Sequence, residues 1–254
     1  MVLRSLTLDE LRIEDEASFR HVGLYDELKQ RLRRDGYRFR VPARGQEIGW
    51  DRALFLNLTF WQAGEQGDVL TADRVAADVV MHVGWHHVAR AALGPAAESA
   101  DGIFLGEAIA SASDLYLVGR LLGHAPDAEF LGTQVPAMSD AAEAAGLTPD
   151  AFAALLESVA EAPERAFEDL RALLFDAATT LLRCDSLDAA EAALAALEGR
   201  RFGALLHHYE LSNWVLSARA NRERAPDPAV RAIDAGLRAA PDAVAWLEKH
   251  WLFA

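Results

Sequence analysis

The sequence contains a single cysteine, Cys184, among its 254 residues. One cysteine excludes an internal disulfide and any zinc site built from several cysteines, so a bound metal would need His, Asp and Glu ligands. Cationic residues are also scarce, because 25 Lys and Arg against 39 Asp and Glu give a net charge of -14. This charge argues against sequence-independent binding to nucleic acid or to anionic lipid, since both rely on clustered cations.

Long apolar segments are lacking as well. No charged amino-terminal segment followed by an apolar run opens the sequence, and the apolar run at residues 53–61 is much shorter than the roughly 20 residues that cross a bilayer. The glycine-rich nucleotide loops and the GxSxG nucleophile motif are absent too. We therefore expect a cytoplasmic protein that binds neither nucleic acid nor membrane.

The first seventy residues carry the strand patterns. Tyr37, Phe39 and Val41 alternate with arginines, which is typical of a half-buried strand, and residues 53–61 (ALFLNLTFW) predict a second strand. With a helix over residues 25–34, these patterns predict a small N-terminal sheet.

From Thr71 onward the sequence predicts helices. The first runs from a Thr71 cap to Leu93, and the second covers residues 103–122 and ends at Gly123. Thr148 and Asp227 each precede a proline, which predicts capped helix starts. Further helices are predicted over residues 150–160, 163–182, 187–197, 202–221 and 243–251.

These patterns together predict a mostly helical α+β fold. Residues 123–139, which contain two prolines and two glycines, predict a linker. We divide the chain into residues 1–123, a sheet with two active-site helices, and residues 124–254, a helical lobe, although both can belong to one continuous domain.

The most specific pattern is a pair of histidines followed by a glutamate. His82 and His86 are four residues apart, so on a helix they lie on one face about 6 Å apart along the axis. Glu107 lies on the next predicted helix, and if the two helices pack antiparallel it reaches the same point. Two imidazoles and one carboxylate suit Zn²⁺ and equally suit Fe(II).

Other polar residues share these helix faces. Asp78 lies on the face of the two histidines, while Ser111 and Asp114 follow Glu107 at spacings of four and three. We expect these three residues around the metal ligands, where Asp78 or Asp114 holds a histidine ring by its outer nitrogen.

The segment DVVMHVGWHHVARAAL and the following GEAIASASDLYLVG resemble the active-site helix and the glutamate helix of the gluzincin metallopeptidases. The resemblance covers residues 78–119. It implies a metallopeptidase-like two-helix core with His82, His86 and Glu107 as ligands of one divalent metal ion, with zinc favoured. It also implies that His207, His208 or Tyr209, from the later helical lobe, stabilises an oxyanion on the substrate.

The sequence departs from this family at one decisive position. Val83 occupies the place of the glutamate that transfers protons in the peptidases, and a valine cannot take up or release a proton. Gly84, unusual inside a helix, predicts a close approach by Trp85 or by another segment. The family's aspartate four residues after the glutamate is replaced by Ser111.

Three functions remain open. The first is a repurposed metalloenzyme that performs a non-proteolytic, metal-dependent reaction on a small molecule, with Zn²⁺ or Fe(II). The second is a catalytically dead pseudopeptidase that binds a peptide or protein along residues 53–61. The third is a hydrolase whose base comes from elsewhere, such as Glu47 or Glu129.

Overall fold

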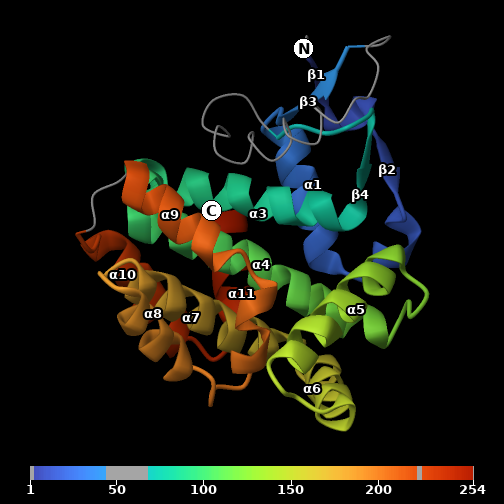
Figure 1. Cartoon of the computed structure of the whole chain (residues 1–254). Coiled ribbons are helices and arrows are strands. Elements are labelled where there is room, and N and C mark those ends of the chain that lie inside the picture. Colours follow the sequence, from blue (N-terminus) through green and yellow to red (C-terminus); the bar gives the residue numbers. More distant parts are fainter. Residues whose placement is uncertain (1–2, 44–67, 222–224, 254) are drawn as a thin grey trace. The chain divides into compact units, whose positions relative to one another are not determined.

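The computed structural model describes residues 3–43, 68–221 and 225–253. They form a mostly helical α+β fold with short strands near the amino terminus, as predicted (Figure 1). The chain divides into two compact units, Met1–Gly84 and Trp85–Ala254, and the division falls inside helix α3 (Ala77–Leu93). The predicted boundary after residue 123 stays a prediction.

The described part of the first unit contains two small sheets. Strand β1 (Leu3–Thr7) pairs antiparallel with β3 (Arg38–Pro42), and β2 (Arg12–Glu14) pairs parallel with β4 (Arg74–Ala76). Strand β3 confirms the strand predicted from the alternation at residues 37–41. The strand predicted at residues 53–61 lies outside the described residues.

Helix α1 (Gly23–Arg34) of the first unit was predicted almost to its ends. It buries Leu24, Leu28 and Leu32 at spacings of four, with two short 3₁₀ turns, η1 (Leu8–Glu10) and η2 (Glu16–Phe19), before it. Helix α3 begins at Ala77 and not at Thr71, because β4 takes up residues 74–76 with Val75 buried.

Gly84 of α3 allows α1 to approach closely. A Cβ atom at Gly84 would lie only 3.0 Å from the Cβ of Leu28, a distance tighter than ordinary packing. The prediction that this glycine admits a neighbouring segment is confirmed, and the segment is α1.

The second unit is entirely helical in its described part. Its elements after α3 are η3 (Gly94–Glu98), α4 (Ala100–Leu122), α5 (Glu129–Ala144), α6 (Pro149–Glu161), α7 (Pro163–Leu181), α8 (Leu187–Ala195), η4 (Gly203–His208), α9 (Leu211–Asn221), α10 (Pro228–Ala239), α11 (Ala243–Leu247) and the π-helical turn η5 (Glu248–Leu252).

The two caps predicted next to prolines are confirmed, whereas the cap predicted at Thr71 is not. The Thr148 hydroxyl accepts from Ala151 N–H at the start of α6, and Asp227 accepts from two backbone N–H groups at the start of α10. These bonds satisfy donors that a helix start otherwise leaves unpaired.

Two predictions about this unit are wrong. Residues 123–139 are not a linker, because helix α5 includes Pro136 and buries apolar side chains, among them Phe130 and Met138. The single helix predicted over residues 202–221 is broken into η4 and α9, and the chain is extended at Tyr209 between them.

Helix α4 lies in the core of the second unit, alongside α7 (Figure 1). At Gly119 an added Cβ would lie 2.7 Å from the carbonyl oxygen of Val159, so the absence of a side chain permits this contact. By length and composition α4 could cross a membrane, but 83% of its most apolar window is buried inside the fold. Such burial is typical of a core helix.

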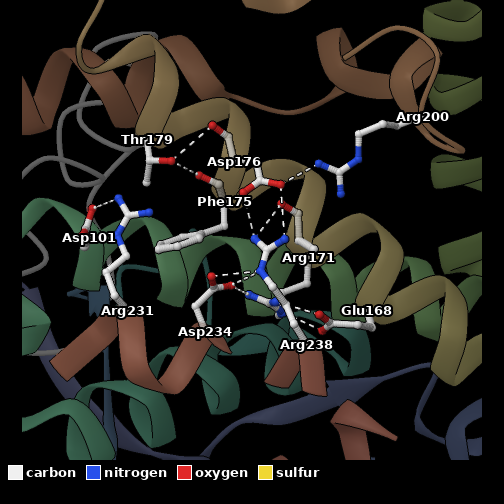
Figure 2. Close-up of polar contacts among 11 residues, drawn as sticks. Asp101, Glu168, Arg171, Phe175, Asp176, Thr179, Arg200, Arg231, Asp234 and Arg238 are labelled. Carbon is white, nitrogen blue, oxygen red and sulfur yellow. Dashed lines mark hydrogen bonds and ion pairs between the residues drawn. The ribbon is translucent and has the colours of Figure 1, made fainter. Parts of the chain in front are cut away.

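A network of alternating charges joins α7, α10 and Arg200, which lies between α8 and η4 (Figure 2). Arg171 of α7 is completely buried and donates to Glu168 at 2.6 and 2.7 Å and to Asp234 of α10 at 2.9 Å. The network continues from Asp234 through Arg238 and Asp176 to Arg200. Three carboxylates and three guanidinium groups thus balance one another.

We expect Arg171→Ala to lower the free energy of unfolding by about 3–5 kcal/mol, because it leaves Glu168 and Asp234 without their buried counter-ion. Urea denaturation measures this change. Arg165→Ala on the same helix is the control, since the Arg165 side chain is 80% exposed and its pair with Asp169 spans 3.8 Å. The control should change stability by less than about 1 kcal/mol, and an equal loss in both variants would contradict a special role of Arg171.

Candidate metal centre

Helix α4 is buried along almost its whole length except for one stripe. Of its central residues, Ile103, Glu107 and Asp114 remain partly exposed, and the spacings of four and seven place them on one face. Ser111 lies between the two acids and is 7% exposed. The partly open face of the core helix therefore presents two carboxylates two helical turns apart.

His86 of α3 lies beside the first of these carboxylates. Its Nε2 atom is 3.7 Å from Oε2 of Glu107, with the side chains 34% and 18% exposed. The structure thus brings together two of the three predicted ligands, one from each of two successive helices. Both side chains retain some access to solvent.

The separation of these two atoms suits two ligands of one metal ion. Two donor atoms bound to one zinc ion at about 2.0–2.1 Å and at a tetrahedral angle are roughly 3.4 Å apart. The observed 3.7 Å between His86 Nε2 and Glu107 Oε2 differs from this value by an amount that a small side-chain movement can remove. Among residues 3–43, 68–221 and 225–253, no three His, Cys, Asp or Glu side chains are gathered as a metal site. The arrangement therefore supplies a pair of donors.

The remaining predicted residues of α3 lie in the first unit. His82 precedes His86 by one helical turn on the same helix, and Asp78 lies in its first turn. Val83, in the position of the missing glutamate, is only 5% exposed. A carboxylate introduced there would replace a buried apolar side chain.

Asp114, at the far end of the partly exposed face of α4, interacts electrostatically with His208 and Tyr209. The charge of Asp114 raises the pKa of both His208 and Tyr209. The two rings meet edge to face, with centroids 5.0 Å apart, whereas His207 is exposed. The structure thus places Asp114 near His208 and Tyr209, two of the three residues that the resemblance assigns to the stabilisation of an oxyanion.

His208 is held in a partly buried position at the end of η4. Burial lowers the pKa of its imidazole, and this effect outweighs the charge of Asp114 and a hydrogen bond to the backbone of Ala137, which both raise it. The ring is therefore neutral at neutral pH. Burial also raises the pKa of Tyr209, so its hydroxyl keeps its proton.

Sequence reasoning missed the contribution of Ala137. The residue lies in α5, within the segment predicted to be a linker, and its backbone bonds to the His208 ring. The apolar spacing of Phe130, Met138 and Ala142, eight and four residues apart, indicates this helix despite Pro136.

Other predicted positions add nothing to this site. Glu47 and residues 53–61 lie outside the described residues. Glu129 is exposed at the start of α5.

Comparison of the chain with protein-family models, curated proteins and solved structures finds no match.

We expect Asp114→Asn to lower the pKa of His208 further, because the variant loses a charge that favours the imidazolium. An NMR titration of the His208 ring protons measures this shift. Glu157→Gln, which removes an exposed charge on α6, is the control and should leave the titration unchanged.

The same pKa shift makes folding stability depend on pH. As the pH falls below 6.5, the ordinary pKa of histidine, the unfolded chain takes up a proton before folded His208 does, so stability decreases. Asp114→Asn should extend this loss to lower pH. A rise of the His208 pKa in the variant would contradict the assignment.

Proposed function

We propose that the protein binds one divalent metal ion through His86 and Glu107, with His82 as the third ligand, and carries out a non-proteolytic reaction on a small molecule. The observation that carries this proposal is the 3.7 Å separation of His86 Nε2 and Glu107 Oε2 on the partly open face of α4. His82 is included as a ligand because it precedes His86 by four residues on the same helix, α3.

The donor set supports Zn²⁺ and Fe(II). Two imidazoles and one carboxylate form catalytic zinc sites, and the same set is the facial triad of iron oxygenases. Three protein ligands leave a coordination position for a substrate, and the bound metal supplies Lewis-acid chemistry there. The likeness to the gluzincin helices favours zinc.

Position 83 argues against ordinary peptide hydrolysis. A buried valine there cannot take a proton from water, so this chain lacks the proton-transferring group of the peptidases at that place. Of the three later candidates, His208 and Tyr209 are partly buried near Asp114, and His207 is exposed. In this proposal His208 or Tyr209 stabilises an oxyanion on the substrate, and the Tyr209 hydroxyl, which keeps its proton, can donate that hydrogen bond.

Metal analysis of protein purified without added metal tests the proposal. We expect about one equivalent of zinc or iron in the parent chain and its loss in His86→Ala, Glu107→Gln and His82→Ala, because two remaining ligands hold a metal weakly. His87→Ala is the matched control, since position 87 is turned by about 100° from the ligand face of the same helix.

Thermal unfolding with added Zn²⁺ or Fe(II) provides a second measurement, since a ligand that binds only the folded chain raises its melting temperature. A parent chain that carries no metal and gains no thermal stability from either ion would contradict the proposed function. Metal retained in Glu107→Gln would contradict the assigned ligand.

A further inference from the structure

We draw no further inference here: the strongest candidate, the acidic outer surface of α5 and α6, where residues 121–163 contain seven exposed carboxylates and no Lys or Arg, is a cluster of acidic side chains alone, and nothing in the described part of the chain shows what binds there.

Discussion

The ion pairs of Arg171 are the constraint on which the second unit depends. A guanidinium group with no exposed surface is tolerable only when its charge is matched and its donors are used, because desolvation of an ion is expensive. Glu168, one turn before it on α7, and Asp234 on α10 meet these requirements. The position of α10 against α7 is thereby tied to an electrostatic balance as well as to apolar packing.

The features predicted correctly from the sequence are mostly local. A capping hydroxyl or carboxylate with proline acts within four residues, so Thr148 and Asp227 reveal the starts of α6 and α10. The strand at residues 38–42 follows from side-chain alternation. Failures arise where tertiary contacts override a local pattern: Pro136 suggested a linker, yet apolar contacts on one face keep α5 helical around it.

The candidate site shows the same limit. The closeness of His86 and Glu107 follows from a short connection between two helices, which favours antiparallel packing. The backbone of Ala137 beside His208 depends on α5, which was not foreseen, and Asp234 lies 63 residues from Arg171. The indole nitrogen of Trp85 is buried without a hydrogen-bond partner among the described residues, and nothing in the sequence indicates this, because it depends on the packing around the ring.

The cations of the charge network have a consequence for chemical modification. All three are arginines, and the whole chain contains just two lysines, Lys29 and Lys249. Lys29 is held by Glu16 with its side chain only 14% exposed. Acetylation, ubiquitination and amine-directed labelling reagents act on lysine, so they leave the charges that hold α7 and α10 together unchanged. Reagents that modify lysine therefore leave the charge network of the second unit unchanged. An amine-reactive probe would label the exposed Lys249 without disturbing that network.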